Sequence, residues 1–224
     1  MPRRPTTRPR PELPGGRDPA PPWLLGLTGG IGAGKSEALA AFGRCGATTL
    51  SSDEAVHRIY ADPEVVAAVG ARFGDDVLDS RGVVDRAVLG PLAFAQDGGL
   101  AFLEGLIHPR VGDRRREWVA ECRARTPSPP LLVCEVPLLF EATLEAEFDA
   151  VIVVTASDEV RRARVAARGQ DFDLRRAHQI AEAVKVARAD RAFENNGDIA
   201  ALGAWVADRY AEYAGRPCGT FRSA

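Results

Sequence analysis

The sequence predicts an α/β fold: a parallel sheet of about five strands flanked by helices, with a helical insert between two of the strands. Three observations lead to this prediction. Short apolar runs of strand length alternate with longer helical patterns along the chain, as they do in βαβ units. One such run, at 23–28, passes through a glycine-rich loop directly into a helical pattern. The stretch 63–126 has amphipathic helical spacing and no obvious strand, so it predicts an inserted helical subdomain.

The glycine-rich loop at 29–36, GGIGAGKS, fits G-x-x-x-x-G-K-[ST] in full, and it predicts a P-loop NTPase or kinase fold. Glycines let successive backbone N–H groups turn inward, and the next helix adds its own N–H groups and dipole. We expect Lys35 at the β- and γ-phosphates, the Ser36 hydroxyl on Mg²⁺ and the Glu37 amide at the α-phosphate. The alternative is a glycine-rich turn before an ordinary helix, but that interpretation does not explain why Lys and Ser follow the last glycine. The expected nucleotide-binding residues of the loop are Gly29, Gly30, Ile31, Gly32, Ala33, Gly34, Lys35, Ser36 and Glu37.

Length and composition fit one sizeable core, because 46% of the 224 residues are hydrophobic. The net charge of −2 predicts no general affinity for nucleic acid. Residues 1–22 hold eight prolines and few apolar side chains, so we expect a disordered tail there, and 215–224 are expected to be loose. No apolar run approaches the roughly 20 residues that a membrane span needs, and no secretory signal is present. We therefore expect a cytoplasmic protein without a membrane partner.

The chain has four cysteines, and none of them stands in a C-x-x-C pair or a metal-type cluster with the three histidines. They are Cys45, Cys122, Cys134 and Cys218. We expect buried or surface thiols in a reducing compartment.

Acidic residues near the ends of two predicted strands are candidates for chemistry. The strand at 47–50 leads to Asp53, which is expected to face the phosphates at the carboxyl edge of the sheet. The alternative is that Asp53 only caps the helix that follows. The strand at 131–136 contains Glu135, and either Glu135 or Asp53 is placed to orient Mg²⁺ through water. Further strands are expected at 150–154 and 192–194.

The helical insert offers two candidates for substrate binding. Arg86 is suited to an anionic substrate, but an exposed helix arginine is the more common case. His108 by itself is more often structural than catalytic. It precedes Pro109, which should interrupt and kink a long helical pattern.

A basic helix follows the strand at 150–154, with Ser157 as its expected cap. The 3, 4 spacing puts Arg161, Arg164 and Arg168 on one face, as in a lid helix that places cations over a γ-phosphate. The alternative is a solvated basic face on which Arg162 pairs with Asp158. Helices are also expected at about 173–190 and at 199–214.

Taken together and in this order, the motifs resemble those of the dephospho-CoA kinase family, from residue 24 to about residue 214. The P-loop alone fits many unrelated NTPases, so the specific part of the likeness is the series of lesser motifs. They are Asp53, V-D-R ending in Arg86, L-E-x-x-x-H-P at 103–109, V-P-L-L-F-E at 136–141, R-x-x-x-R at Arg164 and Arg168, Gln179, K-x-x-x-A-D at 185–190 and N-N-G at Asn195.

The resemblance implies transfer of the ATP γ-phosphate to the 3′-hydroxyl of dephospho-CoA, with ATP and Mg²⁺ as cofactors and no obligate protein partner. It implies a kinase domain at 23–214, with the insert at 63–126 and a lid at about 157–180. Asp53 would be the general base and Lys35, Arg164 and Arg168 the catalytic cations. Substrate would be bound by Asp53, Arg86, His108 and Leu138, and Asn195 would belong to the nucleotide site.

The sequence departs from the family pattern at four places. Ser51 stands where many relatives have an acid, Glu135 where Asp is common, and Glu37 where Thr often follows the P-loop serine. A carboxylate beside the α-phosphate weakens ATP binding unless it points away. The segment between Arg168 and Gln179 is shorter than usual by about one helical turn. The alternatives are a kinase for another nucleoside or nucleotide, and a nucleotide-binding switch that hydrolyses ATP slowly.

Overall fold

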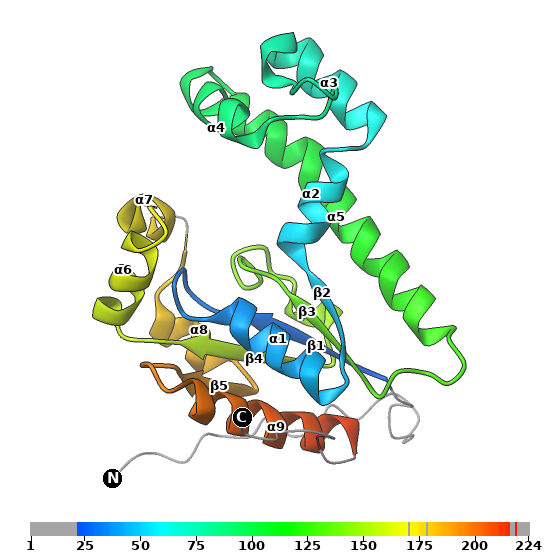
Figure 1. The fold of residues 1–224 in the computed structure, drawn as a ribbon, viewed down its shortest axis with the longest axis vertical. Helices are drawn as coiled ribbons and strands as arrows, with labels where there is room; N and C mark the ends of the chain where they lie inside the picture. The colour runs from blue at the N-terminus through cyan, green and yellow to red at the C-terminus, as the bar shows by residue number, and fades with distance from the viewer. Residues whose placement is uncertain (1–21, 170, 178, 216–217, 219–224) are drawn as a thin grey trace. The chain divides into compact units, whose positions relative to one another are not determined.

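The computed structural model describes residues 22–169, 171–177, 179–215 and 218 (Figure 1). The chain forms two compact units: a sheet unit, residues 1–51 with 121–224, and a helical unit, residues 52–120. The helical unit contains most of the insert expected at 63–126. The tail expected at 1–22 lies outside the described residues except for Pro22, and most of the tail expected at 215–224 lies outside them too.

The sheet unit is built on a parallel sheet of five strands among the described residues, in the order β2-β3-β1-β4-β5. This confirms the predicted α/β class. The glycine-rich loop follows the central strand, which is buried along its whole length as a parallel strand covered on both faces should be. The strands are β1 (Trp23–Thr28), β2 (Thr48–Ser51), β3 (Leu131–Glu135), β4 (Ala150–Thr155) and β5 (Arg191–Glu194).

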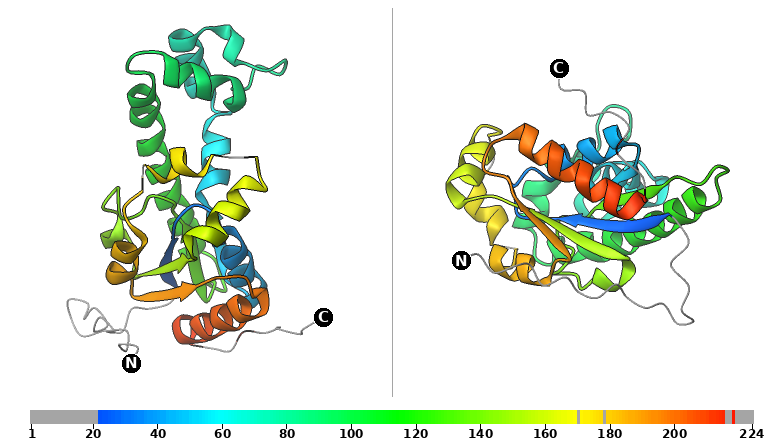
Figure 2. Two further views of the ribbon diagram at one scale, coloured as in Figure 1. Left: turned by 90° about the vertical axis from the view of Figure 1, so that its left-hand side faces the viewer. Right: turned by 90° about the horizontal axis from the view of Figure 1, so that it is seen from below.

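Helices α1 (Lys35–Cys45) and α9 (Ile199–Ala214) lie side by side on one face of the sheet (Figure 2). Inward residues of β1, β3 and β4 form a core with them that includes Leu25, Leu27 and Tyr210. The predicted bounds of the last helix are confirmed. Asp198 caps its start, by accepting from the Ala200 N–H at 2.8 Å, and Gly215 in the left-handed region ends it.

The helix expected at 173–190 is instead broken into α7 (Phe172–Arg176) and α8 (Glu182–Arg188). The helical pattern predicted it as continuous, but the Ile180 backbone leaves the helical ladder for a partner elsewhere in the sheet unit. The Ile180 N–H donates to Oε1 of Glu141 at 3.0 Å. The basic helix α6 (Asp158–Ala166) precedes them, and the Ser157 hydroxyl caps it as predicted by accepting from the Val160 N–H at 3.3 Å.

Two of the four cysteines form a disulfide, so the prediction of free thiols is wrong for Cys45 and Cys218. Cys45 ends α1, and Cys218 follows α9, which packs against α1, so the packing brings together residues separated by 173 positions. Cys122 and Cys134 are buried free thiols.

The helical unit has its own small core, which includes Val65, Val69 and Leu89. Its longest helix, α5 (Gly99–Arg123), runs through Pro109, so the predicted interruption there is wrong. Proline removes only one backbone hydrogen-bond donor from the helix, and the nearby Ile107 is packed in the core of the unit. None of the helices that the structure describes is both long and apolar enough to cross a membrane. The helices of this unit are α2 (Ser52–Ile59), α3 (Pro63–Phe73), α4 (Arg86–Ala95) and α5 (Gly99–Arg123).

Candidate nucleotide-binding site

The loop between β1 and α1 has a backbone path that only glycine can follow. Gly29, Gly32 and Gly34 have φ values of 152°, 76° and 103°. A Cβ at position 29 would lie 1.9 Å from the Val154 carbonyl oxygen, and one at position 34 would lie 2.3 Å from Nδ2 of Asn195. The glycines of the motif are therefore fixed by both conformation and space, as the phosphate-binding interpretation requires.

The carbonyl groups of this loop are held from outside by two side chains. Nη1 of Arg164 lies 3.3 Å from the Gly32 oxygen, 3.4 Å from the Ala33 oxygen and 3.1 Å from the Asn195 oxygen. Nδ2 of the buried Asn195 donates to the Ala33 oxygen at 2.8 Å. Fixing carbonyls on one side of a loop orients its N–H groups to the other side, where an anion binds.

The residues that close the motif occupy the start of α1. Nζ of Lys35 reaches back to the Gly30 carbonyl at 3.2 Å, so its cation lies over the loop. Ser36 is exposed in the first turn of the helix. Glu37 turns along the helix, and its Oε1 accepts from Nη2 of Arg44 at 2.9 Å. This pairing directs the carboxylate away from the helix N-terminus while leaving its backbone N–H in place.

We expect Arg44→Met to raise the KM for ATP by roughly two- to threefold. The released Glu37 carboxylate would repel the α-phosphate by ~0.5 kcal/mol at about 8 Å in water-like surroundings. The double variant Arg44→Met/Glu37→Gln should restore the wild-type KM in a steady-state assay at low salt. Equal KM values for the single and double variants would show that the pair has no influence on ATP.

The arginines of α6 do not form one solvent-facing row. Arg161 is 1% exposed; its guanidinium pairs with Asp158 at 2.5 Å and lies over the Phe172 ring. Arg162 pairs with both carboxylate oxygens of Asp173, at 2.8 and 2.6 Å, so the pairing with Asp158 that the alternative interpretation expected is replaced by a longer-range one. Hydrogen bonds from these arginines lower the pKa of Asp158 and of Asp173. Arg168 follows α6 and is exposed.

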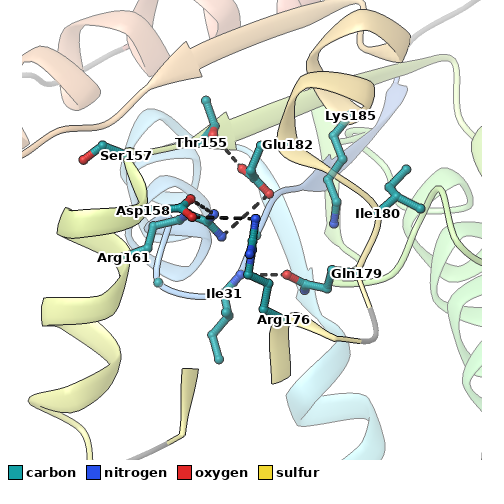
Figure 3. Close-up of polar contacts among 12 residues, drawn as sticks. Ile31, Thr155, Ser157, Asp158, Arg161, Arg176, Gln179, Ile180, Glu182 and Lys185 are labelled. Carbon is teal, nitrogen blue, oxygen red and sulfur yellow. Dashed lines mark hydrogen bonds and ion pairs between the residues drawn. The ribbon is translucent and has the colours of Figure 1, made fainter. Parts of the chain in front are cut away.

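A second polar group lies against the first half of the loop (Figure 3). Thr155 at the end of β4 donates to Oε2 of Glu182 at 2.5 Å, and Oε1 of Glu182 lies 3.9 Å from Nη1 of Arg161. A Cβ at Gly30 would lie 2.4 Å from Glu182 and 2.5 Å from Arg161. A cavity of about 330 Å³ opens among Arg161, Arg176, Gln179 and Glu182.

The edge of the sheet that carries the loop also carries Glu135. This last residue of β3 is in register with Leu27 of β1 and with Ser51 of β2, and it is 4% exposed. The segment that follows it stays close to β1, because the Thr28 hydroxyl donates to the Pro137 carbonyl at 3.4 Å. Among the described residues, no group of three or more His, Cys, Asp or Glu side chains is arranged to hold a metal ion.

Three of the predicted site residues belong to the helical unit. Asp53 is exposed in the first turn of α2, as the second helical residue. Arg86 begins α4, is exposed, and lies over the Tyr60 ring at 5.7 Å; burial of that ring raises the pKa of Tyr60. His108 is exposed on α5. Leu138, in the sheet unit, is half-buried after β3.

The chain matches the family model described as dephospho-CoA kinase over residues 23–201. It belongs to the dephospho-CoA kinase family. Among curated proteins, it is 38% identical over 194 residues to a dephospho-CoA kinase from Thermobifida fusca, which covers 84% of this chain and 94% of that protein. It is 40% identical over 192 residues to one from Anaeromyxobacter dehalogenans, covering 83% and 89%.

Solved structures show the same fold. The crystal structure of TT1252 from Thermus thermophilus superposes with a TM-score of 0.69 at 31% identity, over 85% of this chain and 97% of that one. A dephospho-CoA kinase from Campylobacter jejuni gives a TM-score of 0.60 at 20% identity, over 85% and 96%, and supports the fold. Members of the family are ATP-dependent kinases.

The motif V-P-L-L-F-E contributes to the fold through its last residue. Its final residue, Glu141, holds Nζ of Lys185 at 2.9 Å and the Ile180 N–H at 3.0 Å, and it thereby joins the chain after β3 to α8. Sequence reasoning found Gln179 and Lys185 only as motif members, without partners. It missed Glu182 and Thr155, because neither belongs to a motif and their contact spans 27 residues.

Proposed function

We propose that this chain transfers the γ-phosphate of ATP to the 3′-hydroxyl of dephospho-CoA, giving CoA and ADP. The observation that carries the proposal is a complete P-loop, braced on its carbonyl side, in a chain that matches the dephospho-CoA kinase model over residues 23–201. The absence of an apolar spanning helix among the described residues and the net charge of −2 support a cytoplasmic enzyme with small-molecule substrates.

The P-loop residues suit ATP with Mg²⁺. The N–H groups of the second half of the loop and of the first turn of α1 bind the phosphates, whereas the Ile31 N–H, predicted as part of the nucleotide site, donates to Gln179; Lys35 neutralises charge on the β- and γ-phosphates. Mg²⁺ keeps several waters and needs few protein ligands, which fits a single hydroxyl from Ser36 with a water-mediated contact to Glu135 or Asp53. When bound, the ion would offset negative charge on the transferred phosphoryl group.

Two arginines are proposed to act at the nucleotide in different ways. Arg164 binds the carbonyl groups of the P-loop and the Asn195 carbonyl, and thereby positions the phosphate cradle. Arg168 is exposed and is proposed to supply the cation that stabilises charge on the γ-phosphoryl group in the transition state. Asn195 supports the nucleotide site through its bond to Ala33.

Asp53 is proposed as the general base that orients or deprotonates the 3′-hydroxyl. Its place two residues after β2 supports this, because the parallel strands β1 and β2 end at the same edge of the sheet. Arg86 and His108 are proposed to bind the anionic and polar parts of dephospho-CoA, and Leu138 to contact the substrate.

A panel of acceptors in an ADP-release assay tests the proposed function. Dephospho-CoA should be phosphorylated with a kcat/KM at least 100-fold above those of adenosine, other nucleosides and nucleoside monophosphates. Mass spectrometry of the product should show one added phosphate on dephospho-CoA. Preference for another nucleoside would indicate a kinase of the same fold with a different acceptor, and ATP hydrolysis without a phosphorylated product would indicate a nucleotide switch.

A further inference from the structure

One hydrogen bond joins the P-loop to the segment between α7 and α8. The Ile31 N–H donates to Oε1 of Gln179 at 3.1 Å (Figure 3). Ile31 lies in the first half of the loop, next to Gly32 with its positive φ. The partner comes from a residue 148 positions away, so the bond ties the loop to a distant element rather than to its own strand or helix.

Other hydrogen bonds at the first half of the loop come from the loop and α1 themselves: the Gly30 carbonyl accepts from Nζ of Lys35 and from the Ala33 N–H, each at 3.2 Å. Arg164 and Asn195 hold the carbonyls of Gly32 and Ala33, which lie in the second half. A glycine-rich backbone loses more conformational entropy than other sequences when it is ordered, so each external bond counts toward a preformed phosphate cradle. Gln179 supplies such a bond where Arg164 and Asn195 do not reach.

Gln179 is itself held in place by a buried group. The N–H of the next residue, Ile180, donates to Glu141, and Glu141 pairs with Lys185, whose side chain is 0% exposed. The backbone N–H of Gln179 donates to the Arg176 carbonyl at 2.9 Å. The backbone that carries the Gln179 side chain is therefore held by hydrogen bonds on both sides, and this restrains the oxygen that accepts from Ile31.

The residue type suits a position beside an anion-binding loop. A glutamine offers the same acceptor geometry as a glutamate, but without a negative charge that would repel the phosphates. We propose that Gln179 is a positioning residue for the nucleotide: it orders the first half of the P-loop before the phosphates bind. This proposal rests on the proposed function only because it takes ATP or ADP as the ligand of the loop. It does not depend on which molecule receives the phosphate.

Calorimetric titration of the full chain with ATP and with ADP, without any acceptor, tests the proposal. Gln179→Met removes the acceptor at similar volume and should weaken both nucleotides by roughly three- to tenfold. The control Gln96→Met removes a comparable bond, from Nη1 of Arg72 at 2.6 Å in the helical unit, and should leave both Kd values within the error of measurement. Thermal melting of each variant reports whether the fold is intact.

Two further variants separate positioning from a general structural role. Gln179→Glu keeps the acceptor but adds charge, so its loss of affinity should shrink at high salt, whereas the loss in Gln179→Met should not. In an Ile31→Pro background the donor is already absent, so Gln179→Met should cost nothing more.

Unchanged Kd values in Gln179→Met, or tighter binding of ATP, would overturn the proposal; tighter binding would show that Gln179 competes with the phosphates. Equal losses in both backgrounds would also overturn it. Because these titrations contain no acceptor, their failure is distinguishable from failure of the acceptor panel.

Discussion

Asp53→Asn is expected to lower kcat for dephospho-CoA by roughly 10²–10⁴-fold, the usual contribution of a general base. Asparagine keeps the size and one acceptor oxygen of the side chain but cannot take a proton at neutral pH. The P-loop and the side chains that hold its carbonyls, Arg164 and Asn195, belong to the sheet unit, whereas Asp53 is the second residue of the helical unit, so the variant should bind ATP with nearly the wild-type Kd. Steady-state kinetics and ATP titration together measure the two effects.

The neighbouring acid gives a matched control for this variant. Glu54 is also exposed and lies in the same first turn of α2, so Glu54→Gln changes the charge of the turn by the same amount. Its kcat should stay within about threefold of the wild type, since a screened surface charge contributes little. Wild-type turnover in Asp53→Asn would show that another group accepts the proton, and an equal loss in Glu54→Gln would show that the effect is one of charge alone.

The parts of the fold that sequence could predict are those set by local pattern. Each strand was expected within two residues of its observed bounds, because an apolar run between turn residues fixes a buried parallel strand. The last helix was predicted from its apolar spacing and is confirmed at 199–214. The glycines of the P-loop motif were predictable, because Gly29, Gly32 and Gly34 have the positive φ values that such a turn requires, whereas the roles of Lys35 and Ser36 stay predictions.

The parts that sequence could not predict depend on partners far away in the chain. The helix at 173–190 is broken because Ile180 bonds to Glu141, and nothing in the local pattern signals an acceptor 39 residues distant. Arg164 looked like one of a row of lid cations, but the loop carbonyls that it binds come from 131 and 132 residues earlier. The disulfide follows from the packing of α1 against α9 and not from cysteine spacing.

A substitution that breaks the pair of Lys185 and Glu141 should cost much of the protein's stability. Lys185→Met is expected to lower the free energy of unfolding by about 3–5 kcal/mol, because it leaves the Glu141 carboxylate without its cation in a largely buried place. For a chain of this size, the melting temperature should fall by on the order of 10 °C. Urea unfolding followed by circular dichroism measures the change.

Two variants give this prediction its controls. Arg116→Met removes an ion pair with Asp113 in which both side chains are more than half exposed, and it should cost less than about 1 kcal/mol. The double variant Lys185→Met/Glu141→Leu removes both charges and should recover part of the lost stability, since apolar groups of similar volume replace a buried pair well. A Lys185→Met protein as stable as the wild type would mean that Glu141 is solvated or protonated without cost.

Lys185→Met should also weaken the binding of ATP at the P-loop. Glu141 fixes Ile180 as well as Lys185, so a carboxylate that turns toward solvent in Lys185→Met releases the segment that holds Gln179. The folded fraction of the variant should therefore bind ATP more weakly than the wild type, in proportion to the loss seen for Gln179→Met. Calorimetric titration well below the melting temperature measures this, and full ATP affinity in a destabilised Lys185→Met protein would show that Gln179 keeps its place without the buried pair.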